Sequence, residues 1–181
     1  MRKLKFPAAF IVCLLVMGLY FIYITIREPR HFAEKPNLNE ILQMDLETNY
    51  PKTPEDVIVF YGKILSGLFN EELSNDQTNM LEMQARELMD QELLENYPQA
   101  QYANDMSERI RQYKKSGISY AIEAINQKKD ITYNLKDGME YAFVQQTYYT
   151  HRKSTYTKHK SEYTLRKSED GRWMIYTLTW N

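Results

Sequence analysis

The chain has 181 residues, of which 43% are hydrophobic and 26% are charged, and its formal net charge is −1. This length accommodates one domain of ordinary size, and the near-neutral net charge conceals a division between acidic and basic stretches of the chain. Cys13 is the only cysteine, so an intramolecular disulfide is excluded.

The N-terminal segment from Phe6 to Ile26 contains 21 residues without a charge. A helix of that length rises about 1.5 Å per residue and crosses the roughly 30 Å hydrocarbon core of a bilayer. The alternative is a cleaved signal peptide, but the apolar run is longer than such peptides carry and bulky residues occupy its end. Residues 1–26 are therefore predicted to form an N-terminal tail and an uncleaved transmembrane anchor.

The charges on the two sides of this anchor predict its orientation. Arg2, Lys3 and Lys5 form an acid-free tail that favours the cytoplasmic side, although Arg27 and Arg30 follow the anchor. We expect a single-pass protein of the cell membrane whose C-terminal domain is extracytoplasmic.

Residues 27–52 contain three prolines and are predicted to form a juxtamembrane tether. Within this tether, apolar residues recur at helical spacing and predict one short amphipathic helix. Its apolar face consists of Leu38, Ile41, Leu42 and Leu46.

The folded domain is predicted to span residues 53–181 and to begin with helices. Thr53 supplies an N-cap and Pro54 the first helical position of a helix that runs to about Asn70. A second helix is expected over residues 76–97 and a third over 102–115, where Gly117 supplies the stop. The acidic residues of the second helix are expected to form one solvated face: Glu82, Glu87, Asp90, Glu92 and Glu95.

After Gly117 the apolar pattern changes to the alternation that is typical of strands. Strands are expected over residues 118–126, 131–135, 140–150, 160–167 and 173–179, with glycine turns at Lys136-Asp137-Gly138 and Glu169-Asp170-Gly171. Helices followed by a meandering antiparallel sheet define an α+β domain.

The charge is divided between the two halves of this domain. Residues 37–108 carry 3 basic and 15 acidic residues (net −12), whereas residues 109–181 carry 14 basic and 7 acidic residues (net +7). Such a division allows the two halves to dock and is weak evidence for nucleic-acid binding.

The helix start Thr53-Pro54-Glu55-Asp56-Val57, the following Phe60-Tyr61 and the closing Gly171-Arg172-Trp173-Met174-Ile175 strand resemble the NTF2-like superfamily over roughly residues 53–180. The resemblance implies helices packed on a bent antiparallel sheet around a cone-shaped cavity. Members of that superfamily include polyketide cyclases, steroid isomerases, scaffold subunits of conjugation machinery and membrane-anchored bacterial domains. Its enzymes use an acid, a histidine or a tyrosine deep in the cavity, and no position here matches such a residue.

The densest cluster of cations and aromatic residues lies near the fourth strand. Tyrosines beside cations can bind an anionic polymer or a lipid headgroup through phosphate contacts and stacking, so these are candidate ligands. The alternative is a long hairpin whose tip is only solvated. The candidate binding residues are Tyr149, His151, Arg152, Lys153, Tyr156, Lys158, His159 and Lys160.

No signature of catalysis or of a cofactor is recognisable. His151 and His159 are eight residues apart and lack a third metal ligand, and there is no glycine-rich phosphate loop or serine nucleophile elbow. We expect a non-catalytic binding or scaffold module that contacts another cell-envelope component, and we expect no nucleic acid. The alternative is an NTF2-like domain that binds a small hydrophobic ligand, or acts as an enzyme, through its cavity.

Overall fold

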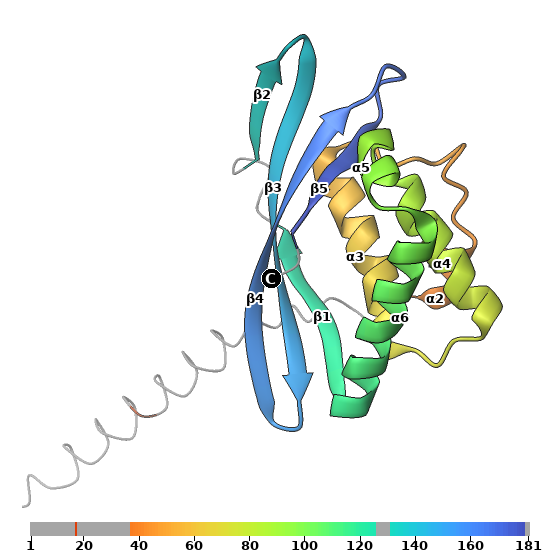
Figure 1. The fold of residues 1–181 in the computed structure, drawn as a ribbon. Helices are drawn as coiled ribbons and strands as arrows, with labels where there is room; N and C mark the ends of the chain where they lie inside the picture. Colours follow the sequence, from red (N-terminus) through yellow and green to blue (C-terminus); the bar gives the residue numbers. More distant parts are fainter. Residues whose placement is uncertain (1–16, 18–36, 126–130, 180–181) are drawn as a thin grey trace, which may run out of the picture. The chain divides into compact units, whose positions relative to one another are not determined.

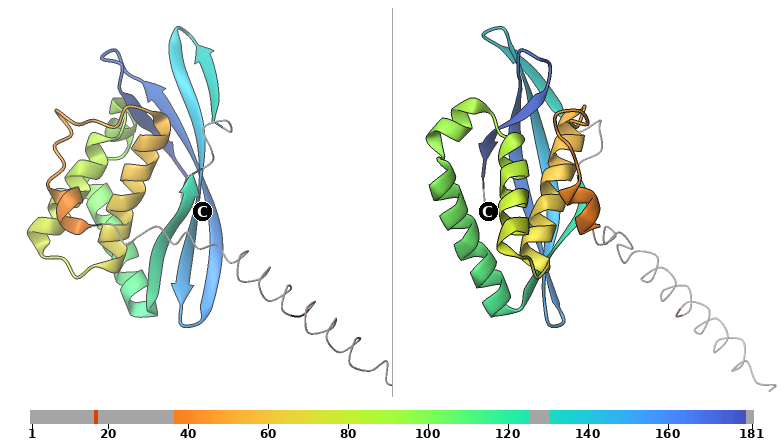
Figure 2. Two further views of the ribbon diagram at one scale, coloured as in Figure 1. Left: turned by 180° about the vertical axis from the view of Figure 1, so that it is seen from behind. Right: turned by 90° about the vertical axis from the view of Figure 1, so that its right-hand side faces the viewer.

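The computed structural model describes Met17 and residues 37–125 and 131–179. The chain divides into two units, Met1–Phe32 and Ala33–Asn181, and the elements named below belong to the second. Helices lie on one face of a five-stranded antiparallel sheet (Figure 1, Figure 2). The expected α+β class is therefore confirmed.

The described helices of this unit are α2 (Leu38–Leu42), α3 (Pro54–Asn70), α4 (Asn75–Glu87), α5 (Gln91–Asn96) and α6 (Gln99–Ser116). α3 begins as predicted, because the Thr53 hydroxyl accepts a hydrogen bond from the Asp56 backbone N–H at 3.1 Å. α4 begins with a capping box formed by Ser74 and Gln77. Gly117 ends α6 with a φ of 61°, a conformation that favours glycine.

The prediction of one helix over residues 76–97 is wrong, because the chain leaves the helical path between α4 and α5. At this break the Asp90 backbone N–H donates to the Ile175 carbonyl at 2.8 Å, and the Ile175 N–H donates to the Leu88 carbonyl at 2.7 Å. A parallel bridge thus joins Met89 to the last strand. The Asp90 carboxylate then caps α5 by accepting from the Glu92 N–H at 2.9 Å.

The strands are β1 (Ile118–Ile125), β2 (Thr132–Lys136), β3 (Met139–Arg152), β4 (Thr155–Lys167) and β5 (Trp173–Leu178). β4 pairs with one side of β3 from Tyr141 to Arg152, and β5 pairs with β4. On the other side of β3, β2 pairs with residues 139–143 and β1 with residues 146–152. The β2–β3 and β3–β4 turns therefore lie at opposite ends of the sheet (Figure 1).

The segment after residue 36, predicted as part of a tether, contacts the rest of this unit. Ile41 and Leu46 belong to the hydrophobic core, and the Gln84 amide donates to the Ile41 carbonyl at 2.8 Å. The Tyr50 hydroxyl donates to the Trp173 carbonyl at 3.0 Å. Residues 37–52 are thus held against α4 and β5.

The predicted anchor from Phe6 to Ile26 lies, apart from Met17, outside the described residues. In the described part of the chain, no helix has the length and apolar character needed to cross a membrane.

Candidate binding surface

The β3–β4 hairpin carries all eight candidate binding residues. Arg152 pairs with Thr155, so only Lys153 and Ser154 form the turn. Both strands extend further toward this turn than predicted, which places Tyr149 and His151 on β3 and Tyr156 and the residues after it on β4. The cluster is therefore built on paired strands.

Strand alternation separates the cluster onto two faces of the hairpin. Ala142, Val144, Gln146 and Tyr148 are buried on the face that packs against the helices. The odd-numbered residues of β3, and the β4 residues opposite them, point their side chains to the other face. The face away from the helices, called the outer face below, carries Tyr149, His151, Tyr156, Lys158 and Lys160.

Cross-strand pairs order the side chains of the outer face. The rings of His151 and Tyr156 stack with their centroids 4.2 Å apart at an angle of 22°. One step further from the turn, the Lys158 ammonium lies 5.8 Å from the centroid of the Tyr149 ring. Aromatic rings and cations alternate here as in surfaces that bind anionic polymers.

His159 and Arg152 lie on the helix-facing side, and Lys153 lies in the turn itself. The His159 ring stacks on the Tyr148 ring, with centroids 4.8 Å apart. The His159 Nε2 lies 2.9 Å from the Thr150 hydroxyl. His151 and His159 therefore point to opposite faces and are not placed to bind one metal ion together.

The helix-facing side of the sheet contains a buried polar group among aromatic rings. The Tyr163 hydroxyl donates to the Gln146 side-chain carbonyl at 3.2 Å, and the rings of Tyr61 and Tyr163 meet edge to face at 6.1 Å. Burial raises the pKa of Tyr61, Tyr120 and Tyr163 above the ordinary phenol value. These phenols stay neutral near pH 7 and act as packing groups there.

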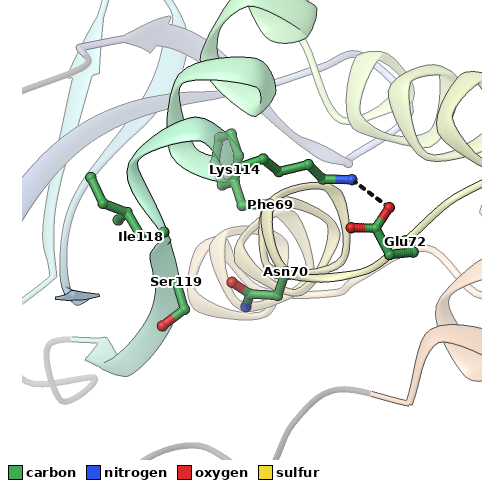
Figure 3. Close-up of a pocket in the computed structure, with 7 residues that line it drawn as sticks. Phe69, Asn70, Glu72, Lys114, Ile118 and Ser119 are labelled. Carbon is green, nitrogen blue, oxygen red and sulfur yellow. Dashed lines mark hydrogen bonds and ion pairs between the residues drawn. The ribbon is translucent and has the colours of Figure 1, made fainter. Parts of the chain in front are cut away.

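A pocket of about 270 Å³ lies where α3 and α6 meet β1 (Figure 3). The ion pair between Lys114 and Glu72, at 3.3 Å, lies at its side. The Asn70 side chain in this pocket is bound to the backbone of Tyr120. The described lining residues are Phe69, Asn70, Glu72, Lys114, Gly117, Ile118 and Ser119.

The prediction that the acidic residues of the second helix form a solvated face is wrong for two of the five residues. Glu82 and Asp90 are buried, and burial raises the pKa of the Glu82 carboxyl. Arg166 binds both Asp90 and Glu92, and its guanidinium lies 4.6 Å from the Tyr176 ring centroid. Asp90 directly precedes Gln91 and Glu92, and an aspartate in that position is a helix N-cap signal. Its partner on β4, Arg166, cannot be predicted from the local sequence.

The family model for a domain of unknown function, DUF6715, matches residues 1–180. The chain belongs to the DUF6715 family. The match includes the apolar N-terminal segment of this DUF6715 protein as well as the α+β part. No curated protein and no solved structure matches the chain.

Proposed function

We propose that this DUF6715 protein is a membrane-anchored, extracytoplasmic and non-catalytic binding or scaffold module whose β3–β4 hairpin contacts an anionic component of the cell envelope. One observation carries the proposal. Between Tyr141 and Ser161 the chain contains four lysines and arginines and no acidic residue, and all four cations are exposed: Arg152, Lys153, Lys158 and Lys160. Crowded like charges repel one another, and an anionic ligand relieves that repulsion.

The backbone of the turn supports a role in association. Lys153 has a φ of 55°, and the first position of a two-residue hairpin turn favours glycine. A non-glycine residue with such a φ costs on the order of 1 kcal/mol, and residues of this kind cluster at functional sites. A cation therefore occupies a position where glycine would give the more stable turn.

The aromatic groups of the outer face support the same proposal. Tyr156 is 51% exposed and its ring stacks on His151, so the pair offers an amphipathic surface beside Lys158. A ligand that alternates charged groups with less polar ones, such as a polymer of phosphodiesters, is complementary to such a surface. A lipid headgroup has the same chemistry in a compact form.

The proposal includes the anchor from Phe6 to Ile26 and an NTF2-like fold for the domain. The uncharged length of that segment supports the anchor. The order of elements, with helices first and a sheet afterwards, and the position of the helices on one face of that sheet support the fold (Figure 2).

The alternative, a small hydrophobic ligand bound between the helices and the sheet, has less support. The Tyr120 and Tyr148 rings pack against one another there at 5.0 Å, and Tyr61 packs against Tyr163.

Photocrosslinking in intact cells tests the proposed function. Tyr156 is replaced by p-benzoylphenylalanine in the full chain, and Met83 on α4, which is 56% exposed, is replaced in a matched control. We expect an adduct from position 156 that position 83 does not give, and mass spectrometry then distinguishes a polymer, a lipid and an acidic protein. Recovery of the protein alone from both variants would overturn the proposal.

A further inference from the structure

Two edge segments of the sheet are closed to further strand pairing. On β5, the Ile175 backbone is bound by Leu88 and Asp90 at 2.7 and 2.8 Å. On β1, the Asn70 amide donates to the Tyr120 carbonyl at 2.6 Å and accepts from the Tyr120 N–H at 2.8 Å. Each contact occupies backbone groups that another strand would otherwise bind.

Two further edge segments are β2 and the part of β4 before Tyr163, and no described residue pairs with the side of β2 that faces away from β3. The β2–β3 hairpin extends beyond the helices (Figure 1, Figure 2). Natural proteins usually protect such an edge with charges or proline. β2 has no proline and carries one charge, Lys136, at its end.

The same hairpin exposes large apolar side chains. Tyr133 is 57% exposed, Leu135 68%, Met139 40% and Phe143 44%. Tyr133 and Leu135 lie together on the helix-facing side of the hairpin, whereas Met139 and Phe143 lie on its other side.

The hairpin is also fixed in its geometry. Asp137 and Gly138 have φ values of 53° and 78°, as the tight turn between twisted strands requires. At the other end of β2, the Tyr133 ring meets Trp173 edge to face at 5.8 Å. β2 is therefore a regular strand with an open edge between exposed apolar side chains.

We propose that the occupant of this edge is β2 of a second copy of this chain, paired antiparallel about a two-fold axis at Asn134. In that register Tyr133 lies opposite Leu135 of the partner subunit, and Thr132 lies opposite Lys136 of the partner subunit. Tyr133 and Leu135 share the helix-facing side of the hairpin, so the apolar pairs fall on one side and the polar pairs on the other. A two-fold contact must be self-complementary, and the sequence of β2 meets that condition about Asn134.

The apolar area at the β2 edge agrees with a reversible dimer. A stable interface buries about 800 Å² on each partner, and the Tyr133 and Leu135 side chains with one paired strand edge supply only part of that. This surface lies at the opposite end of the sheet from the β3–β4 turn (Figure 1), so the dimer does not depend on the proposed anionic ligand.

Cysteine crosslinking of the full chain in detergent micelles tests the register. In a Cys13→Ser background, Asn134→Cys places two thiols opposite one another, with Cα atoms about 4.5 to 5.5 Å apart, which a disulfide spans. Thr132→Cys is the matched control, because the two copies of position 132 lie four residues apart along the strands, or about 14 Å. We expect Asn134→Cys to form disulfide dimers at least ten times faster than Thr132→Cys, and Thr132→Cys to crosslink with Lys136→Cys in a mixture.

Equal rates for Asn134→Cys and Thr132→Cys, or a disulfide from Asn134→Cys to a different protein in cells, would overturn the proposal. A second measurement uses the concentration dependence of the mass by analytical ultracentrifugation. Leu135→Glu should weaken dimerisation at least tenfold, whereas Met83→Glu, which replaces an exposed methionine on α4, should leave it unchanged. A parent chain that stays monomeric at all concentrations, or equal effects of the two glutamates, would also contradict a β2–β2 dimer.

Discussion

The side-chain amide of Asn70 binds the backbone of Tyr120 as a neighbouring strand would, with one hydrogen bond to the carbonyl at 2.6 Å and one from the N–H at 2.8 Å. Asn70 is the last residue of α3, and its Nδ2 also donates to the Ser66 hydroxyl at 3.1 Å. The Asn70 side chain therefore ties the end of α3 to the first strand.

Replacement of Asn70 by alanine should lower the free energy of unfolding by about 1 to 3 kcal/mol, because the Tyr120 backbone groups lose partners in a partly buried position. Thermal unfolding of the full chain in nanodiscs of neutral lipid measures this effect. Asn79→Ala is the control, since Asn79 is exposed on α4, and it should change stability by no more than about 0.5 kcal/mol. Equal melting temperatures for the two variants would show that the Asn70 amide is dispensable.

Alkaline pH should unfold the domain cooperatively. Burial raises the pKa of Tyr61, Tyr102, Tyr120 and Tyr163 above the ordinary value of 10.0. A group whose pKa is raised by folding stabilises the folded state below its unfolded pKa, and this contribution is lost as the pH rises above about 10. The loss becomes steeper as the pH rises above 10 and approaches about 5 kcal/mol per pH unit for four such phenols.

The absorbance of phenolate and the far-ultraviolet circular dichroism should therefore change together above pH 10. Tyr120→Phe removes one of the four ionisations and should move the transition to higher pH. Gradual phenolate formation with an unchanged circular dichroism signal would mean that these tyrosines ionise in the folded state. That result would contradict their burial.

The helix starts and turns were predictable from the sequence because the deciding interactions are local. Thr53 caps α3 through the Asp56 N–H, three residues away, and Asp137-Gly138 forms the expected turn before β3. The break between α4 and α5 was not predictable in this way. Leu88 and Met89 continue the apolar pattern of a helix, and the break is imposed by Ile175, which is distant in the sequence.

The position of the candidate binding surface was predictable, whereas the distribution of its residues between faces was not. The polar composition around Lys153 suggested a solvated tip, but the paired strands continue to Arg152 and Thr155. A shift of one residue in the strand register exchanges the two faces, so only the observed register separates His151 from His159. The Asp90 and Arg166 pair has no local signal on the β4 side.

Lys153→Gly should have opposite effects on stability and on association. Glycine relieves the φ of 55° at this turn position and should stabilise the domain by roughly 0.5 to 1 kcal/mol. The loss of one cation should weaken binding to anionic vesicles, and Ser154→Gly, next to it in the turn, should not. A variant that is neither more stable nor weaker in binding would mean that Lys153 is neither strained nor part of the surface.

The proposed topology predicts where reporters fused to the chain are active. A reporter that functions only outside the cytoplasm should be active after Ile26 and after Asn181, and intact mass should show that residues 1–26 remain on the protein. A cytoplasm-only reporter that is active at both positions would reverse the orientation. A mature N-terminus beyond Ile26 would replace the anchor by a cleaved segment.

Binding of the full chain in neutral nanodiscs to poly(glycerol phosphate) and to vesicles that contain phosphatidylglycerol tests the role of the hairpin most directly. One variant changes the four hairpin cations, Arg152, Lys153, Lys158 and Lys160, to glutamine. The control changes four exposed cations elsewhere, Lys52, Arg111, Lys114 and Lys115, to glutamine and has the same net charge. Surface changes of this kind alter stability by roughly 0.5 kcal/mol per site, so both variants should remain folded.

The account predicts salt-sensitive binding of the parent chain to at least one of the two probes. It also predicts at least a tenfold loss of affinity in the hairpin variant and less than a threefold loss in the control. Equal losses in the two variants, or a parent chain that binds neither probe, would contradict it.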